Sequence, residues 1–365
     1  MTEKIRTLIV DDSAFARSII VKRLGVDSDI EVIGVAKDGI DALEKIKQPK
    51  PNVVTMDITM PRLDGLAALE RIMAECPTPV IMLSALTAEQ APATISALEL
   101  GAVDFYLKPS TLNPAGMAEH SDELVQKIKI AAQIDLAKMR RNGRGNHRAS
   151  MEKALANGSA SRAGPSVEKG HQSNGSRYHG KVLVIGSSTG GPKALSQLIP
   201  DLPADLPIPV LLVQHMPPGF TKSFAERLNQ YSAIRVKEAE IGDHLEAGLV
   251  LVAPGDHHMV VTKAGRIALN QEPPQCGVRP SVDVTMDSVV KIYGGKTMGV
   301  VLTGMGSDGS NGTAQIKARG GMVAVEHEST CAIYGMPRCV VENGNADKVL
   351  PLPKMAREIV RMCSA

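Results

Sequence analysis

The chain has 365 residues, of which 43% are hydrophobic and 22% are charged, and its net charge is +2. At about 150 residues per domain this length predicts two domains with some chain to spare. The composition is that of a globular protein and excludes wholesale disorder. No apolar run approaches the roughly 20 residues that span a bilayer, and the cysteines form no CxxC pair. We therefore expect a reduced, cytoplasmic monomer with no membrane insertion.

A basic, polar stretch separates two series of predicted elements. Residues 138–180 hold nine Lys or Arg residues and two Glu residues, and they are rich in Gly, Ser and Asn. This composition is typical of a flexible linker, and we interpret its charge as that of a solvated tether, with no nucleic acid as partner. The predicted division is a first domain over residues 1–130, a helix end and linker over 131–180, and a second domain over 181–365.

The first domain alternates short apolar runs with helical patterns. Strands are predicted at TLIVDD, EVIGVA, NVVTMDI, PVIMLSA and DFYLKP, and each is followed by a helix. Five strand–helix pairs within about 130 residues predict an α/β fold with a doubly wound, five-stranded parallel sheet.

Polar side chains stand at the carboxyl ends of these strands, where open parallel sheets bind ligands. Asp11 and Asp12 end the first strand and Asp57 ends the third. With the strand order 2-1-3-4-5 the three carboxylates converge, which favours Mg²⁺ as their occupant. A carboxylate beside that metal can accept a phosphoryl group, and Ser84 and Lys108 end the next strands, in reach of its oxygens. Taken singly, each residue is more often a helix cap or a solvated side chain.

Together, IVDD, MDITMP, LSA and LKP resemble the receiver domain of two-component response regulators, over residues 5–125. The resemblance implies a flavodoxin-like fold with Mg²⁺ as cofactor and a histidine kinase as phosphodonor. It also implies one role for each matching residue: phosphorylation at Asp57, Mg²⁺ binding by Asp11, Asp12 and Asp57, a switch hydroxyl at Ser84, a switch aromatic at Phe105 and a phosphoryl contact from Lys108.

A second series of elements begins at Lys181. Strands are predicted at KVLVIG, PVLLVQ, RVKEAE, MGVVLTG and MVAVE, with helices at SSTGGPKALSQLI, TKSFAERLNQYS, SVDVTMDSVVKIY and GTAQIKAR. Residues 245–270 alternate between apolar and polar side chains, which predicts a hairpin-like insertion. The domain as a whole is predicted to be a second doubly wound α/β unit with a largely parallel sheet.

Three reactive residue types directly follow predicted strands of this domain. Ser188, His215 and Asp308 come to one edge of a parallel sheet, where a serine nucleophile, its base and an orienting carboxylate could meet. Residues 186–190 also fit G-x-S-x-G, although the order Ser, His, Asp differs from that of the α/β-hydrolases. Alone, His215 is more often structural and Asp308 could merely cap a helix. The adjacent His257 and His258 point to opposite faces of a strand, which argues against a zinc site.

Two other classes of function remain open on these residues. The Gly-rich loop GSSTGGPKA could cradle the phosphates of a nucleotide, although it lacks both GxGxxG and a P-loop Lys-Ser/Thr. Alternatively, the second domain could be a noncatalytic interaction module gated by phosphorylation.

Five longer motifs resemble the catalytic domain of the chemotaxis protein-glutamate methylesterases, over residues 181–363: IGSSTGGP, QHMPPGFTKSFAERLN, VAPGDHHM, RPSVDVTMDSV and LTGMGSDG. The resemblance implies that Ser188 is the nucleophile, His215 the base and Asp308 its orienting carboxylate. It places an oxyanion-binding backbone amide at Met305 and requires no cofactor for the ester reaction.

The resemblance also predicts the biological setting. The expected protein is a phosphorylation-activated serine hydrolase that demethylates glutamate methyl esters on chemoreceptors and deamidates certain glutamines, which gives sensory adaptation in chemotaxis. Its partners would be the methylated chemoreceptors as substrate and the chemotaxis histidine kinase as phosphodonor. The unphosphorylated receiver is expected to block the catalytic cleft.

Overall fold

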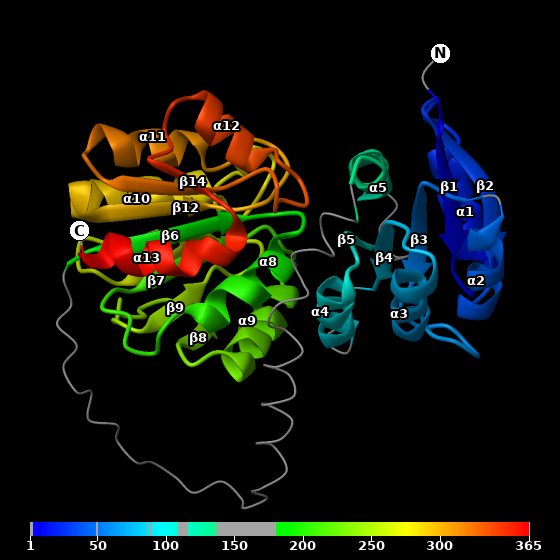
Figure 1. The fold of residues 1–365 in the computed structure, drawn as a ribbon, viewed down its shortest axis with the longest axis horizontal. Coiled ribbons are helices and arrows are strands. Elements are labelled where there is room, and N and C mark those ends of the chain that lie inside the picture. Colours follow the sequence, from blue (N-terminus) through cyan, green and yellow to red (C-terminus); the bar gives the residue numbers. More distant parts are fainter. Residues whose placement is uncertain are drawn as a thin grey trace, which may run out of the picture. The chain divides into compact units, whose positions relative to one another are not determined.

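The computed structural model describes residues 3–48, 50–85, 87, 90–108, 116–134, 136 and 180–364. The chain divides into two units, Met1–Ala137 and Lys138–Ala365, and Figure 1 shows the elements of both. Nearly all of the predicted linker lies outside the described residues. Within the described part of the chain, no helix is both long enough and apolar enough to cross a bilayer.

The first unit is built on a five-stranded sheet whose strands are all parallel, in the order β2-β1-β3-β4-β5. This order confirms the predicted fold and places the ends of β1 and β3 side by side. Its strands are β1 (Ile5–Val10), β2 (Ile30–Ala36), β3 (Val53–Asp57), β4 (Val80–Ser84) and β5 (Asp104–Leu107).

Helices connect these strands, and polar side chains fix where several of them begin. Ser13, Asp38 and Asp64 each accept hydrogen bonds from backbone N–H groups of the first turn that follows. Helix α3 packs between α2 and α4, while β3 and β4 are buried along their whole length. The helices are α1 (Ala14–Leu24), α2 (Gly39–Lys47), α3 (Gly65–Glu75), α4 (Gln90–Leu100) and α5 (Gly116–Ala131).

The second unit contains a seven-stranded parallel sheet in the order β14-β13-β12-β6-β7-β9-β8. The chain starts at β6, builds outward through β7, and then returns to lay β12 against the other side of β6. The strand order therefore reverses at β6 and β12, which is where open α/β sheets bind ligands. These strands are β6 (Val182–Ser187), β7 (Val210–Gln214), β8 (Arg235–Glu238), β9 (Leu249–Val252), β12 (Thr297–Val301), β13 (Met322–Glu326) and β14 (Lys348–Leu350).

The predicted hairpin-like insertion over residues 245–270 is wrong in its first part. Leu249–Val252 forms β9, which is buried and pairs in parallel with both β7 and β8 inside the main sheet. Only β10 (His258–Val261) and β11 (Ile267–Asn270) form an antiparallel pair. The short apolar run Leu249–Val252 was predicted to be one arm of a hairpin, but it is a strand with a parallel neighbour on each side.

Helices cover this sheet, and four of them match the predicted helical patterns: α8 (Gly191–Leu198), α9 (Phe220–Tyr231), α10 (Val282–Tyr293) and α11 (Ser310–Ala318). The sequence patterns did not identify α12 (Met336–Glu342), α13 (Met355–Ser364) or the short strand β14. Helix α10 packs against β6, β12 and the β10–β11 pair, so it lies behind the edge at which β6 and β12 end. Single 3₁₀ turns complete the unit at Ile199–Asp201, Gly294–Lys296 and Leu352–Lys354.

Candidate active site and acidic cluster

Three carboxylates meet at the carboxyl edge of the first sheet, as the strand order predicts. Oxygens of Asp11, Asp12 and Asp57 all lie within 4.8 Å of one another. Asp11 is fully buried and Asp57 is 5% exposed, while Asp12 is exposed. The Lys108 ammonium bridges the two buried carboxylates, with Nζ 2.7 Å from Asp11 Oδ2 and 2.8 Å from Asp57 Oδ2. We infer that this cluster, called here the acidic cluster, is held together by the Lys108 ammonium, which follows the end of β5.

Burial and charge act against each other on these groups. Burial raises the pKa of Asp57 above its ordinary value and the nearby Asp11 adds to the rise, although Lys108 opposes it. Burial alone would lower the pKa of Lys108, but the two carboxylates raise it overall. Two or three carboxylates at one open edge form the oxygen donor set that Mg²⁺ prefers, so these residues fit the expected metal.

The other two residues expected at this edge lie near the acidic cluster without bonding to it. Ser84 is fully buried; its hydroxyl lies 2.9 Å from Thr94 Oγ1 and also contacts the carbonyl of Ala85 at 3.2 Å. Phe105 is 6% exposed, and the Lys127 ammonium lies 6.0 Å from its ring centre. Among the described residues, no hydrogen bond joins Ser84 to the three carboxylates. The Ser84 hydroxyl is thus bonded toward α4 in this structure.

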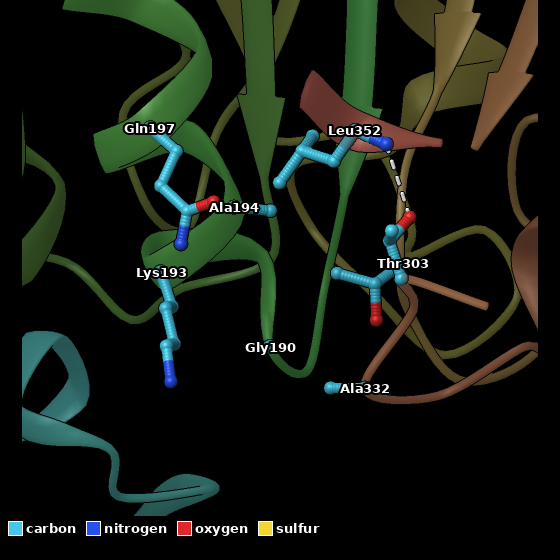
Figure 2. A pocket seen from close by; sticks show the side chains of 8 residues that line it. Gly190, Lys193, Ala194, Gln197, Thr303, Ala332 and Leu352 are labelled. Atoms are coloured by element: carbon cyan, nitrogen blue, oxygen red, sulfur yellow. Dashed lines mark hydrogen bonds between the residues drawn. The ribbon is translucent and has the colours of Figure 1, made fainter. Parts of the chain in front are cut away.

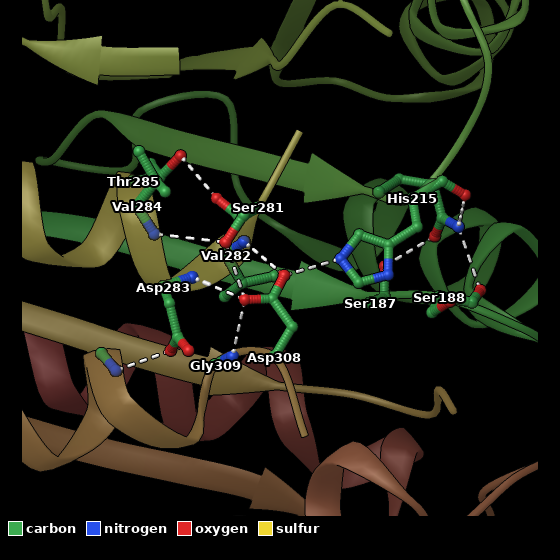
Figure 3. A network of polar contacts seen from close by, with 12 residues as sticks. Ser187, Ser188, His215, Ser281, Val282, Asp283, Val284, Thr285, Asp308 and Gly309 are labelled. Carbon is green, nitrogen blue, oxygen red and sulfur yellow. Dashed lines mark hydrogen bonds and ion pairs between the residues drawn. The ribbon is translucent and has the colours of Figure 1, made fainter. Parts of the chain in front are cut away.

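In the second unit, His215 and Asp308 form a close pair. His215 directly follows β7, and its Nε2 lies 2.8 Å from Asp308 Oδ2 (Figure 3). Asp308 is 2% exposed, and four further groups donate to it. Those donors are Ser281 Oγ at 2.8 Å, Val282 N at 2.7 Å, Asp283 N at 3.0 Å and Gly309 N at 3.1 Å. These four hydrogen bonds fix the position of the carboxylate independently of its contact with the imidazole.

The surroundings of Asp308 keep it ionised although it is buried. Burial by itself would raise its pKa, but His215 and the backbone N–H groups of α10 hold the pKa below the ordinary value. Because Nε2 of His215 faces Asp308, Nδ1 is the ring nitrogen left for a nucleophile. Among the described residues, no hydrogen bond joins His215 to Ser188; such contacts are often long before substrate binds.

Ser188 lies in the tight turn between β6 and α8. Its N–H donates to the carbonyl of Thr303 at 3.1 Å, and its carbonyl accepts from Gly191 N at 2.8 Å. The turn needs glycine at position 190, where φ is 78°. Gly304 packs closely against the turn, because a Cβ added at Gly304 would lie 2.8 Å from Ser188 Cβ. The sheet edge therefore holds His215 after β7, Ser188 after β6 and Asp308 on the loop after β12, and these three strands are neighbours in the sheet.

Met305 follows Gly304 on the loop after β12. Its side chain is 43% exposed, and its N–H donates no hydrogen bond among the described residues. A free N–H next to the nucleophile turn is the kind of group that stabilises an oxyanion. Gly304 N donates to the carbonyl of Ile333 at 3.1 Å, and this bond anchors the loop beside Ser188 to the segment before α12.

A small pocket adjoins the nucleophile turn at Gly190 (Figure 2). Gly190, Thr303 and Lys193 line it, together with Thr330, whose Oγ1 accepts from Leu352 N at 3.0 Å. Burial lowers the pKa of Lys193. Lys193, in the first turn of α8, thus brings a partly desolvated ammonium to this pocket.

Three buried polar residues of the second unit, Ser281, Gln214 and Glu326, were not singled out from the sequence. Ser281 caps α10, and its position before a helical pattern is a recognisable N-cap signal. Gln214 and Glu326 end buried strands, where no sequence pattern distinguishes them from ordinary strand ends. His258 is fully buried, and its Nδ1 accepts from Ser281 N at 3.2 Å, so this histidine supports the backbone beside Asp308. No cluster of possible metal ligands in the described part of the chain includes His257 or His258.

Comparison with known proteins gives both halves of the chain a family. Residues 183–359 match the family model of the CheB methylesterase, and residues 7–115 match that of the response regulator receiver domain. A protein-glutamate methylesterase/protein-glutamine glutaminase from Symbiobacterium thermophilum is 51% identical over 98% of this chain and 96% of its own length. A protein of the same name from Pyrococcus abyssi is 46% identical over 98% of this chain and 93% of its own.

Among solved structures, the crystal structure of the Thermotoga maritima CheB methylesterase catalytic domain is 46% identical, with a TM-score of 0.49, and the match covers 50% of this chain and 98% of that one. The full-length matches favour an esterase over a nucleotide-binding or a noncatalytic second domain. The chain belongs to the protein-glutamate methylesterase/protein-glutamine glutaminase family, and it carries a response regulator receiver domain in front of the catalytic one.

Proposed function

We propose that this protein demethylates glutamate methyl esters on chemoreceptors with Ser188, His215 and Asp308, and that phosphorylation of Asp57 activates it. The observation that carries the catalytic assignment is the His215–Asp308 pair, at 2.8 Å, on the strand next to the nucleophile turn. Ser188 is a weak nucleophile unless a base removes its proton, and the carboxylate holds the imidazole of that base in a fixed orientation.

The reaction follows the geometry of the pair. Nδ1 of His215 takes the proton of Ser188 as Oγ attacks the ester carbonyl, and the ionised Asp308 stabilises the imidazolium that forms. The N–H of Met305 would donate to the oxyanion of the tetrahedral intermediate. His215 then returns the proton to the leaving methanol, and water hydrolyses the acyl-enzyme, which regenerates Ser188 and leaves a glutamate side chain on the receptor. A glutamine side chain passes through the same intermediate and releases ammonia.

The receiver domain supplies the control in this proposal. Asp57 would accept a phosphoryl group from a chemotaxis histidine kinase, with Mg²⁺ held by Asp11, Asp12 and Asp57. The bound metal would neutralise the charge of the transferred phosphoryl oxygens. Lys108, already bridging two of the carboxylates, would bind the phosphoryl group, and the Ser84 hydroxyl would turn from α4 toward it. Phe105 is proposed as the aromatic residue that responds.

Methanol release from methylated receptor tests the catalytic assignment. We expect Ser188→Ala to abolish release, while Ser223→Ala, a matched change on α9, leaves it intact. Release by Ser188→Ala at the wild-type rate would refute the esterase assignment. Saturable nucleotide binding that survives the substitution would favour the nucleotide-binding alternative.

The regulatory assignment is tested by adding a small phosphodonor and Mg²⁺ to the same assay. We expect the phosphodonor to raise the rate of wild type and to leave Asp57→Asn unchanged. A full response in Asp57→Asn would refute phosphorylation at this residue.

The domain division proposed for the chain places the receiver at residues 1–130, the helix end and linker at 131–180 and the catalytic domain at 181–365. The division of the chain into two compact units, one up to Ala137 and the other from Lys138 on, supports it. Limited proteolysis within residues 141–178 should release two fragments that keep their folds, whereas a fragment that unfolds on cleavage would contradict the division.

A further inference from the structure

Gln214 is a buried polar residue whose side chain bonds to both strands that carry the nucleophile and the base. It is the last residue of β7 and is 2% exposed. Its Oε1 accepts from Ser187 Oγ at 2.7 Å. Its Nε2 donates to the carbonyl of Ser188 and to the carbonyl of His215, each at 3.0 Å. Both amide protons are thus used on the backbones of the two residues that the proposed reaction brings together (Figure 3 shows Ser187, Ser188 and His215).

The regular backbone pairing of β6 and β7 ends where this side chain begins. The last paired residues are Ser187 and Gln214, and one further backbone bond runs from His215 N to Ser187 O at 3.1 Å. Beyond that point the two strands diverge into the turn before α8 and the loop before α9. The Nε2 bond to the Ser188 carbonyl crosses this gap, and the Nε2 bond to the His215 carbonyl holds the chain that follows β7 to the same amide group. The distance between Ser188 and His215 therefore depends on this amide.

Packing around Gln214 leaves its amide group one position. A Cβ at Gly191 would lie 2.1 Å from Gln214 Oε1 and 2.9 Å from Ser187 Oγ, so the first turn of α8 sits directly on the Ser187–Gln214 bond. The carbonyl of His215 has no other donor among the described residues. Loss of the amide would leave that carbonyl without a donor in this part of the chain, which favours a different loop conformation.

We propose that Gln214 is a positioning residue for the esterase reaction: its amide group fixes the spacing of Ser188 and His215 by holding both of their carbonyls. This inference rests on the proposed function of those two residues. Gln214 does not touch the reacting atoms, and its effect is on the rate of attack rather than on substrate binding. A misplacement of about 1 Å between nucleophile and base can lower a rate by about 100-fold.

The test uses the full chain with phosphodonor and Mg²⁺, and compares Gln214→Met with wild type. Methionine keeps the side-chain length but removes both donors. A second variant, Gln214→Glu, keeps an oxygen that can accept from Ser187 but also lacks the two amide donors. The control is Gln230→Met, a change on the exposed face of α9. A fluorophosphonate that labels Ser188 gives two readouts, the fraction of competent sites and the rate of labelling, and methanol release gives kcat and KM.

We expect kcat per labelled serine to fall about 10- to 100-fold in both variants, with KM within about twofold of wild type and the labelling rate falling in parallel. A smaller labelled fraction with unchanged kcat per labelled site would show a purely structural role and overturn the proposal. Failure of both variants to fold, with a normal Gln230→Met, would overturn it in the same way. If Ser188→Ala remains active, the proposed function fails; if it is inactive and Gln214→Met is normal per site, only this inference fails.

Discussion

Glu326 offers a sharp test of how burial acts on a charge in this protein. It ends β13 and is fully buried, and its Oε2 accepts a hydrogen bond from Thr303 N at 2.8 Å. Burial raises its pKa from the ordinary 4.5 to about 7. We predict that Glu326→Gln stabilises the catalytic domain at alkaline pH, because the amide keeps an oxygen for Thr303 and cannot ionise.

The sign and size follow from proton linkage. Below about pH 4.5 the carboxyl is protonated in both the folded and the unfolded chain and costs nothing. As the pH rises toward 7 the folded state holds the proton more tightly, so stability is lost, and above about pH 7 the loss is complete. A shift of about 2.5 units corresponds to about 3 kcal/mol, of which about 2.5 kcal/mol develops between about pH 5 and 8.5. For a domain of this size that is about 5–10 °C in the unfolding temperature.

Calorimetry of the full chain at these two pH values measures the effect on the catalytic domain's transition. The difference in unfolding temperature between Glu326→Gln and wild type should grow by about 5–10 °C from the acid to the alkaline condition. Any cost of burying the amide is independent of pH and cancels in this comparison. Glu328→Gln, two residues away and exposed, is the control and should show no such growth. An equal difference at both pH values would refute the reasoning.

Three further predictions concern the two sites. Asp308→Asn should lower kcat by about 10⁴-fold with the fold intact, because His215 loses the carboxylate that orients it; a loss below about tenfold in methanol release would contradict the pairing. Gly304→Ala should destabilise the catalytic domain by about 1–3 kcal/mol in denaturant unfolding and slow the labelling of Ser188, because the added Cβ would lie 2.8 Å from the Cβ of that serine. If both the stability and the labelling rate stay at their wild-type values, the loop moves enough to accommodate the methyl group and the prediction is wrong. Lys108→Ala should weaken the response of methanol release to a phosphodonor, because the acidic cluster loses its bridging cation, and an undiminished response would remove that lysine from the phosphorylation step.

Local patterns in the sequence were sufficient for the first parallel sheet, for five of the seven strands of the second, and for the residues at their carboxyl edges. Asp11, Asp57 and Lys108 could be placed together because each ends a strand of a predictable order. His215 and Asp308 follow the same rule, and the structure brings them to 2.8 Å. The catalytic and phosphorylation roles of these residues stay predictions, since they depend on reactions rather than on position.

What the sequence could not provide depends on long-range pairing and on desolvation. The run Leu249–Val252 looked like an arm of a hairpin because alternation is local, whereas its partners β7 and β8 are chosen by the whole sheet. Gln214 and Glu326 end apolar strands, and nothing in the neighbouring residues shows that their polar groups are buried. Their importance comes from contacts with residues 26 and 23 positions away in the chain, which no local window contains.

The placement of β6 between β7 and β12 has a consequence for synthesis of the chain. Strand β6 and its partner β7 leave the ribosome early, but the other edge of β6 stays unpaired until β12 has been made. During that interval a nascent chain presents an apolar strand edge that can pair with other chains, and it lacks Asp308, which lies beyond β12. A polypeptide truncated before that strand would therefore carry Ser188 and His215 on an incomplete sheet, prone to aggregation and without the carboxylate that orients the base.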